Sequence, residues 1–418
     1  MLVQVTVKNF RSFKEETTLS MVASMIKEKK DESVFDVTNK LSLLKNAVIY
    51  GANASGKSNL FMALSFMKDF IQNSSKETQL TEKINVSRFK LSAETKDTPA
   101  SFEIVFFYEG IRYRYGFAVD EERIHAEWLF YTPKKQEVEV FTRVKQEFYL
   151  KSHFKSEEII VEDDRVRQNA LLLSVSAQFN GKIAKKILEW FSRFNCISGV
   201  HSRKHAAITL SLLDGEKGTK AILGFLKDAD TGIEDLKMIE KNRTIIKENK
   251  EEEEVLVSIK TYHSKYNSKK EVIGSIPFDM LADESNGTQK FFELSGAFIE
   301  TLKHGKVLII DELAARLHPR LVKAVCELFN SREKNPHNAQ LIFASHNTNI
   351  LRKDIFRRDQ IWFVEKDCFG ASELYSLVEY KQKGDKKVRN DASYEKDYLL
   401  GKYGGVPCVR EFEMHYGD

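Results

Sequence analysis

The sequence predicts an α/β protein in which an antiparallel β lobe and a parallel α/β core flank an inserted segment. Short aromatic and β-branched runs alternate with turn signals from about residue 84 to 150, which is typical of an antiparallel meander. From residue 280 onward, helical patterns alternate with continuous apolar runs, as in parallel strands that are buried on both faces. Between them, residues 151–279 combine helical patterns with a β-hairpin. We therefore expect three parts, at residues 1–150, 151–279 and 280–418.

The composition is that of a soluble globular chain with more than one lobe. The chain has 418 residues, 42% hydrophobic and 30% charged, and a net charge of +4, which neither requires nor excludes nucleic acid as a partner. Its four cysteines lack CxxC or metal-ligand spacing, so we expect a reducing compartment. The chain begins with a strand-like alternation instead of a signal peptide, and no apolar run reaches the roughly 18 residues of a membrane span. These features predict a cytoplasmic protein without a membrane partner.

In chain order, the first elements place a glycine-rich loop between a strand and a helix. Residues 1–10 alternate at period two, and Asn46–Tyr50 is a short apolar run that ends at a glycine, as a buried strand does. After the loop, helical spacing places Leu60, Leu64, Met67 and Phe70 on one face. The clearest strands of the meander are Ser101–Tyr108, Ile111–Val119 and Ala126–Tyr131.

The rest of the chain supplies further helices and strands. In the insertion we expect helices at Leu171–Val175, Ile183–Phe194 and Ala221–Leu226, followed by a hairpin of Thr244–Ile246 and Val255–Tyr262. The charged run Lys247–Glu254 is interpreted as its solvated tip. In the C-terminal part we expect helices at Gly287–His304 and His318–Asn330 and strands at Val307–Ile310 and Gln340–Ala344.

The segment Gly51–Ser58 matches G-x-x-x-x-G-K-S in full. Its glycines let backbone N–H groups wrap a phosphate, Lys57 brings positive charge to the β- and γ-phosphates, and Ser58 offers a hydroxyl to Mg²⁺. A chance match in a glycine turn is disfavoured because a strand precedes the loop and a helix follows it. The residues expected to bind ATP here are Gly51, Asn53, Ala54, Ser55, Gly56, Lys57, Ser58 and Asn59.

A second motif, Lys306–Glu312, has four apolar residues followed by two carboxylates. This is the form of a Walker B strand, which delivers its carboxylates to the edge of an open α/β sheet where ligands bind. Asp311 would hold Mg²⁺ through water, and Glu312 would orient and deprotonate the attacking water, with Lys57 assisting. The alternative is a strand that ends in a surface acidic pair, and the nearby P-loop motif disfavours it.

Two more motifs could contact the nucleotide, one just after a buried strand and one at the start of a helix. His346 lies just beyond the strand 340–344 and could donate a hydrogen bond to a γ-phosphate. A lone histidine is usually structural, but this one follows the Walker B strand by one helix, which favours a catalytic switch role. The segment Asp283–Gln289 places small residues at a helix start, where unpaired N–H groups can bind an anion. An ordinary helix cap by Ser285 or Asn286 is an equal interpretation of the residues alone.

The order of these motifs resembles the ABC-type ATPases of the SMC and RecF kind. Ser-x-Gly-x-Gln at residues 285–289 would be their signature motif, and Val7–Phe13 is similar to their first strand and turn. Over nearly the whole chain the sequence also resembles the stand-alone AAA-family ATPases of bacterial defence loci. These include the RloA and AbiLi groups and are related to the ATPase half of OLD-family nucleases. The further matching stretches are Ser87–Leu91, Arg112–Phe117, Ala126–Leu129, Ala177–Asn180 and Tyr398–Gly404.

The resemblance implies an ABC-type ATPase head that uses ATP and Mg²⁺. Ser285 and Gly287 would contact the nucleotide held by another subunit, which implies a homodimer or larger homo-oligomer through an ATP sandwich. It also suggests that Arg11 reaches a phosphate, and a surface arginine is an equal interpretation. The sequence departs from the family pattern at Ala314, where an acidic or polar residue is common. It also has no secure Q-loop glutamine, because Gln178 lies in the insertion.

The resemblance suggests an anti-phage defence role, in which ATP controls a separate effector. That effector would be an operon-encoded nuclease or toxin, and DNA or phage would be the trigger. About 70 residues follow His346, which is short for an attached nuclease domain. The acidic residues there, Asp385, Asp391 and Asp397, are interpreted as a solvated tail.

The alternative is an ATP-gated clamp that grips DNA during repair or recombination. Its candidate basic patches are Lys27–Lys30, Arg203–His205 and Lys381–Arg389, but the near-neutral charge balance favours the interpretation that they are solvated charge. A transporter subunit is disfavoured because the chain has a long insertion and lacks a clear Q-loop.

Overall fold

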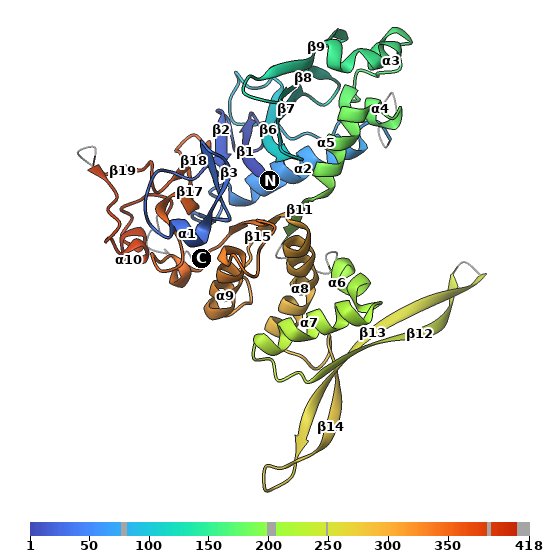
Figure 1. The fold of residues 1–418 in the computed structure, drawn as a ribbon, viewed down its shortest axis with the longest axis vertical. Helices are drawn as coiled ribbons and strands as arrows, with labels where there is room; N and C mark the ends of the chain where they lie inside the picture. The colour runs from blue at the N-terminus through green and yellow to red at the C-terminus, as the bar shows by residue number, and fades with distance from the viewer. Residues whose placement is uncertain (77–81, 199–205, 248–249, 383–385, 408–418) are drawn as a thin grey trace, which may run out of the picture.

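The computed structural model describes residues 1–76, 82–198, 206–247, 250–382 and 386–407 (Figure 1). Within this part, two large sheets form the body: a seven-stranded sheet in the order β10-β9-β8-β7-β6-β1-β2 and a six-stranded sheet in the order β11-β15-β16-β5-β17-β18. The first is antiparallel throughout, and the second is mainly parallel. The predicted mixed α/β fold class is confirmed.

The antiparallel sheet is the predicted meander, joined by the N-terminal strand. Its strands are β1 (Leu2–Lys8), β2 (Thr17–Ser20), β6 (Ala100–Tyr108), β7 (Ile111–Val119), β8 (Ile124–Thr132), β9 (Val138–Val144) and β10 (Glu147–Leu150). Burial alternates along β1 and β6, because one face of the sheet packs into the core. Phe106 of β6 stacks on Trp190 of α5 (Lys182–Ser192), with ring centroids 4.0 Å apart. The meander is therefore fixed to the helices that follow it.

The second sheet carries the sequence motifs at the ends of its strands. It consists of β5 (Asn46–Tyr50), β11 (Phe194–Ser198), β15 (Val307–Asp311), β16 (Gln340–Ala344), β17 (Ile361–Lys366) and β18 (Ser372–Ser376). β5 and β16 have the predicted bounds and are buried along their whole length. β18 alone pairs antiparallel. The carboxyl ends of β15, β16 and β5 therefore lie at one edge of the sheet.

Helices cover both faces of this sheet (Figure 1). α2 (Lys57–Asn73) packs with Ala47, Ile49 and Ile309 on one face. α8 (Asn286–His304) and α9 (Pro319–Asn330) pack with Val48 and Ile310 on the other. Adjacent strand residues thus point to opposite cores, as expected for a sheet buried on both sides.

Smaller elements connect these layers. The helices are α1 (Lys30–Ser33), α3 (Glu158–Glu162), α4 (Leu172–Gln178), α6 (Ala206–Leu213), α7 (Glu216–Asp228) and α10 (Tyr394–Leu399), and the strands β3 (Val34–Thr38) and β4 (Leu41–Leu44) form a hairpin. One predicted helix end is wrong: α5 stops at Ser192, and Phe194 begins β11, which pairs parallel with β15.

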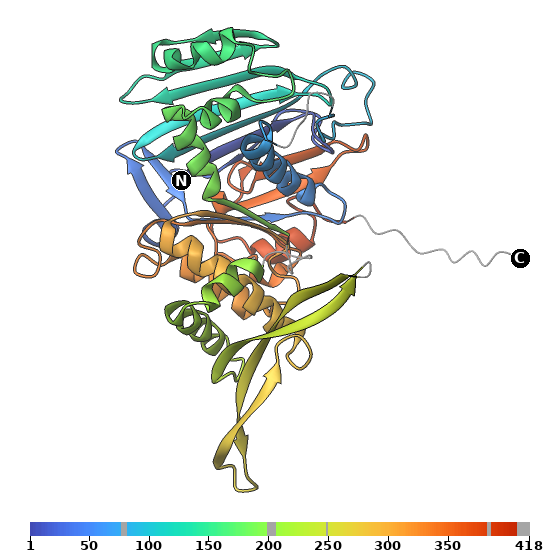
Figure 2. The same cartoon turned by 90° about the vertical axis from the view of Figure 1, so that its right-hand side faces the viewer.

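Two joined hairpins project from the body (Figures 1 and 2). They are built from β12 (Asp235–Lys247), β13 (Lys250–Tyr266) and β14 (Val272–Asp279), and we call residues 235–279 the hairpin arm. The predicted hairpin tip is shorter than expected: β12 and β13 pair out to Lys247 and Lys250, so residues 250–254 belong to β13, and residues 248–249 lie outside the described part. β14 was not predicted. β13 serves both hairpins, and the three strands lie side by side only near residues 260–262.

The residues after His346 form β17 and β18, and others among them also pack within the body of the protein. Asp397, predicted to be solvated tail, accepts a hydrogen bond from the Tyr403 hydroxyl at 3.1 Å and pairs with Lys402 at 2.7 Å. Asp391 is exposed beside Arg389, as predicted, and Asp385 lies outside the described residues. No helix in the described ranges is long and apolar enough to cross a membrane.

Candidate functional site

The P-loop leaves β5 at the edge of the parallel sheet and enters α2 at Lys57. Gly56 has φ 117°, and a Cβ there would lie 2.3 Å from Ser372 Oγ and 2.7 Å from Ser12 Oγ. A Cβ on Gly51 would lie 2.4 Å from the Val364 carbonyl oxygen. Both glycines of the motif are therefore required by space, and Gly56 also by backbone conformation.

Lys57 folds back across this loop. Its Nζ donates hydrogen bonds to the carbonyl oxygens of Gly51 at 2.8 Å and Ala52 at 2.9 Å. Burial lowers the pKa of Lys57 to about 8, and the nearby carboxylates of Asp311 and Glu312 partly oppose this. A buried ammonium in a glycine-rich loop is suited to bind phosphate groups, which would replace the lost solvation.

Asp311 and Ser58 fit a magnesium site. Burial raises the pKa of Asp311, while a hydrogen bond with the Ser58 side chain lowers it. Oδ1 of Asp311 is buried and has no hydrogen-bond partner, although the residue stands at the open end of β15. A carboxylate oxygen and a hydroxyl are hard oxygen donors of the kind that Mg²⁺ prefers. The residues present therefore fit the ion, and Ser58 and Asp311 would hold it.

Glu312 and His346 meet at the ends of adjacent strands. Nε2 of His346 lies 3.2 Å from Oε1 of Glu312. Burial and the charge of Lys57 lower the pKa of His346, so its ring is neutral at pH 7 although the two carboxylates oppose the shift. Glu312 has φ 59°, a left-handed conformation that glutamate rarely adopts. Such strain is often stored at functional sites.

Side chains from outside the motif hold the P-loop from behind. Ser372 of β18 donates its hydroxyl to the Ser55 carbonyl oxygen at 2.5 Å. Asn59 donates to Ser12 Oγ at 2.8 Å, and the Ser12 carbonyl accepts from the Ser372 N–H at 2.7 Å. No sequence motif predicts a role for Ser372. Ser12 lies in the matching stretch Val7–Phe13, which was the available signal.

We call these contacts of Ser12, Asn59 and Ser372 the brace. Arg11 is next to Ser12 in the sequence, but it is itself exposed. Its φ is 52°, its N–H donates to the Ser87 carbonyl at 2.8 Å, and its guanidinium lies 5.8 Å from the Phe10 ring centroid. These contacts hold the turn in which Ser12 reaches the P-loop. They do not bring the Arg11 side chain to the loop.

The signature segment lies at the same edge of the sheet, beside the core that α8 and α9 form with Val48 and Ile310. Ser285 caps α8, and its Oγ accepts from the Thr288 N–H at 3.1 Å. α8 runs back along β15 through a turn at Gly305, so its first residues lie near the carboxyl end of that strand. A Cβ on Gly287 would lie 3.1 Å from the Arg316 carbonyl oxygen in the loop after Glu312. Ser285 is exposed, and α8 and α2 are on opposite faces of the sheet.

The C-terminal segment packs on the start of the P-loop. A Cβ on Gly405 would lie 3.7 Å from Cα of Gly51, and the Tyr398 hydroxyl donates to the Gly405 carbonyl at 2.9 Å. Tyr398 also packs near Tyr50, with ring centroids 5.8 Å apart. The matching stretch Tyr398–Gly404 was recognised in the sequence without a role. In the structure its Tyr398 packs near Tyr50, the residue before the motif, and Gly405, the residue after the stretch, lies near Gly51.

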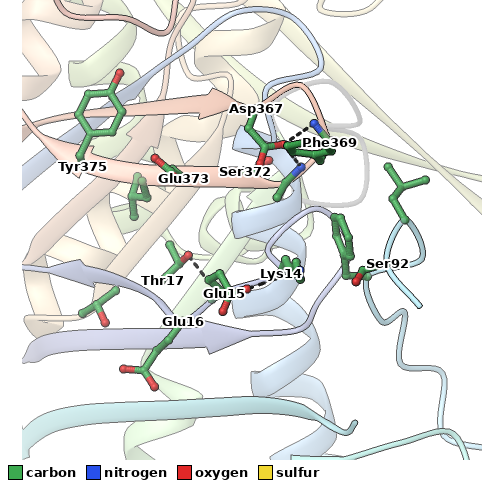
Figure 3. Close-up of a pocket in the computed structure, with 15 residues that line it drawn as sticks. Lys14, Glu15, Glu16, Thr17, Ser92, Asp367, Phe369, Ser372, Glu373 and Tyr375 are labelled. Atoms are coloured by element: carbon green, nitrogen blue, oxygen red, sulfur yellow. Dashed lines mark hydrogen bonds and ion pairs between the residues drawn. The ribbon is translucent and has the colours of Figure 1, made fainter. Parts of the chain in front are cut away.

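A separate cavity of about 520 Å³ adjoins the P-loop through Ser372 (Figure 3). Its lining comes from the turn before β2, the segment near Ser92 and the β17–β18 hairpin, where Phe369 is exposed. None of the residues Gly51–Ser58 lines it. This cavity is therefore distinct from the place where Lys57, Asp311 and Glu312 meet.

The fold and this site define a P-loop nucleotide-binding protein with Walker A and Walker B motifs. A family model described as "AAA domain, putative AbiEii toxin, Type IV TA system" matches residues 47–352, and the chain belongs to this family. No curated protein matches the chain.

Several solved structures of SMC heads are similar to the chain. The SMC head domain from Thermotoga maritima is 14% identical, with 90% of this chain and 98% of that chain covered, at a TM-score of 0.41. The Smc head domain with an extended coiled coil, bound to the C-terminal domain of ScpA from Pyrococcus furiosus, is 13% identical, with 96% and 98% covered, at 0.40.

Proposed function

We propose that this chain hydrolyses ATP as an ABC-type ATPase head, at a site that two copies complete together. The observation that carries the proposal is the division of the motifs by the sheet. Lys57, Asp311 and Glu312 converge at its carboxyl edge, while Ser285 is exposed at the start of a helix on the opposite face from α2. A second copy facing this edge would bring its own Ser285 and the N–H groups of its α8 to the γ-phosphate.

Each residue has a distinct part in this mechanism. Lys57 and the N–H groups of the P-loop would bind the β- and γ-phosphates, and Ser58 and Asp311 would hold Mg²⁺, which would supply positive charge to the phosphates. Glu312 accepts a proton from the attacking water. His346 is neutral and has one N–H, which it donates to Glu312 to keep that carboxylate oriented, and the same N–H would turn to the γ-phosphate when ATP is bound.

The shared site is tested by mixing two inactive variants. Lys57→Ala removes ATP binding but leaves the signature intact, and Ser285→Arg blocks the signature but leaves the P-loop intact. Mixed dimers contain one complete site. Half of the random dimers are mixed, so the equimolar mixture should recover about a quarter of wild-type turnover. Recovery would not occur if each chain used its own Ser285.

We infer a regulatory role in a cytoplasmic anti-phage defence system, in which ATP-driven closure and opening control a separate nuclease or toxin. The description of the matching family, which names a putative toxin of a type IV toxin–antitoxin system, supports this class of role. The test is co-expression with the neighbouring reading frame. A stable complex whose effector activity changes between ATP and ADP would support the proposal, and an effector indifferent to this chain would contradict it.

The DNA clamp has less support from the structure. Lys29, in one candidate basic patch, pairs with Glu32 at 2.9 Å and donates to the Asp354 carbonyl at 2.8 Å. Arg203–His205 lies outside the described residues, as does part of Lys381–Arg389. Duplex binding that needs ATP and weakens steeply with salt would favour the clamp over the defence role.

A further inference from the structure

Glu284, the residue directly before Ser285, is anchored in the hairpin arm. Its Oε1 accepts a hydrogen bond from Thr261 Oγ1 at 2.5 Å and lies 2.7 Å from Nε2 of His263. Both partners belong to β13. The Glu284 side chain is only 7% exposed, and Thr261 is fully buried. A carboxyl group is costly to bury unless it is hydrogen-bonded, so these contacts hold it firmly in place.

A second set of contacts ties the same segment to the arm. The Asp279 carboxylate accepts hydrogen bonds from Ser258 at 2.9 Å and from Lys260 at 3.1 Å. It also accepts from the Leu281 N–H, while its own N–H donates to Asp283 Oδ2 at 2.7 Å. The link between β14 and α8 is therefore a folded turn and not a loose connection.

These anchors meet the arm at its root. The three strands are side by side only near residues 260–262, and Thr261 lies in that stretch. From the other side, Nε2 of Gln289 in the first turn of α8 donates to the Glu284 carbonyl at 2.8 Å. Glu284 thus connects the place where both hairpins join to the helix start that carries Ser285. Movement of the arm root would move Ser285 with it.

We propose that Glu284 is a positioning residue that fixes Ser285 to the root of the hairpin arm, so that the arm controls the hydrolysis step. This inference rests on the proposed function, in which Ser285 completes the partner's site. A displacement of about 1 Å in such a group can cost up to about a hundredfold in rate. Nucleotide binding by Lys57 and the P-loop should be unaffected, because they lie beside the core on the α2 side of the sheet.

The experiment measures turnover and the binding of a fluorescent (mant) ATP analogue for the full chain. Glu284→Ala should lower kcat about tenfold to a hundredfold, with unchanged affinity for mant-ATP. Glu284→Gln keeps the Oε1 acceptor for Thr261 and should restore most of the turnover. Glu271→Ala is the matched control, because Glu271 lies at the far turn of the same arm, where it accepts from Asn267. Its turnover should equal wild type.

The outcomes separate this inference from the proposed function. If Ser285→Arg is inactive but Glu284→Ala turns over normally, Glu284 does not position the signature and the inference fails. If Ser285→Arg itself turns over normally, the shared-site function fails instead. Should Glu284→Ala not fold, Thr261→Val removes one donor at nearly constant volume. Normal turnover in Thr261→Val and in His263→Gln would then overturn the inference.

Discussion

Nε2 of His346 lies 3.2 Å from Oε1 of Glu312, and these two residues follow neighbouring parallel strands. The histidine is neutral at pH 7, since burial and Lys57 lower its pKa, so it can hold the carboxylate by a hydrogen bond without neutralising it as a base. Glu312 has a left-handed backbone, with φ 59°, at this position.

The first prediction concerns Glu312 as the base. Glu312→Gln keeps the shape and a hydrogen bond to His346 but cannot accept a proton, so ATP turnover should fall about a hundredfold or more. ATP should still bind, and mass measurement with ATP present should show dimers that persist longer than those of the wild type. Normal turnover in this variant would show that another group activates the water.

A second prediction follows from the pKa of Lys57, which is about 8 without nucleotide. Bound phosphates favour the charged amine, so the pKa is higher in the complex. ATP affinity should therefore be fully present below pH 8 and fall by up to about tenfold per pH unit as the pH rises above it. Titration with mant-ATP between pH 7 and 10 measures this.

The control is Lys57→Arg, which stays charged over this range. Its affinity should be weaker but independent of pH. A flat profile in the wild type would mean that the amine is not deprotonated before ATP binds.

A third prediction tests the brace behind the P-loop. Ser372→Ala removes the hydrogen bond to the Ser55 carbonyl and should cost about 1 kcal/mol of stability. Because the brace contacts the loop itself, mant-ATP affinity should also fall. Ser376→Ala in the same strand is the matched control, since its hydroxyl bonds Glu379 instead. Equal ATP affinity in the two variants would argue against the brace.

The fourth prediction concerns the C-terminal segment. Gly404 has φ 70°, and a Cβ there would lie 2.4 Å from Glu365 Oε2 and 2.5 Å from the Tyr375 hydroxyl. Gly404→Ala should reduce the free energy of unfolding by about 1–3 kcal/mol. It should also weaken ATP binding, because the neighbouring Gly405 lies against Gly51.

Gly401→Ala separates backbone strain from packing. Gly401 has φ 72°, but its Cβ would meet only Val406, at 3.4 Å. Thermal unfolding should show a loss of stability in both variants, and only Gly404→Ala should bind ATP more weakly. Unchanged ATP affinity in Gly404→Ala would show that this segment does not influence ATP binding.

The sequence was most informative where local chemistry determines the structure. Asn46–Tyr50 and Gln340–Ala344 were predicted to the residue, because continuous apolar runs bounded by turns have few alternatives. The P-loop, the Walker B carboxylates and His346 were expected near one another because each follows a strand of the parallel sheet. The carboxyl ends of parallel strands lie at one edge of the sheet.

Contacts that join distant parts of the chain were not predictable in the same way. Ser372 braces Ser55 from 317 positions away, and nothing in its local sequence marks it. The charged residues 250–254 form a strand because β12 pairs with them, and their sequence shows no apolar alternation that would have predicted this pairing. Glu284 lies within the segment Asp283–Gln289 that the sequence indicates, but its buried contacts with Thr261 and His263 depend on the arm folding back to α8.

The sharing of β13 between two hairpins gives the arm an unusual freedom of length. Each hairpin could gain or lose residues in matched pairs, one pair per strand, and every remaining side chain would keep its face of the ribbon. A single-residue insertion would instead reverse the faces beyond it. Either tip could thus be extended, shortened or replaced by a reporter domain, provided residues 258–263 are left intact. The two projecting ends can therefore change in length independently of the pairing at residues 260–262.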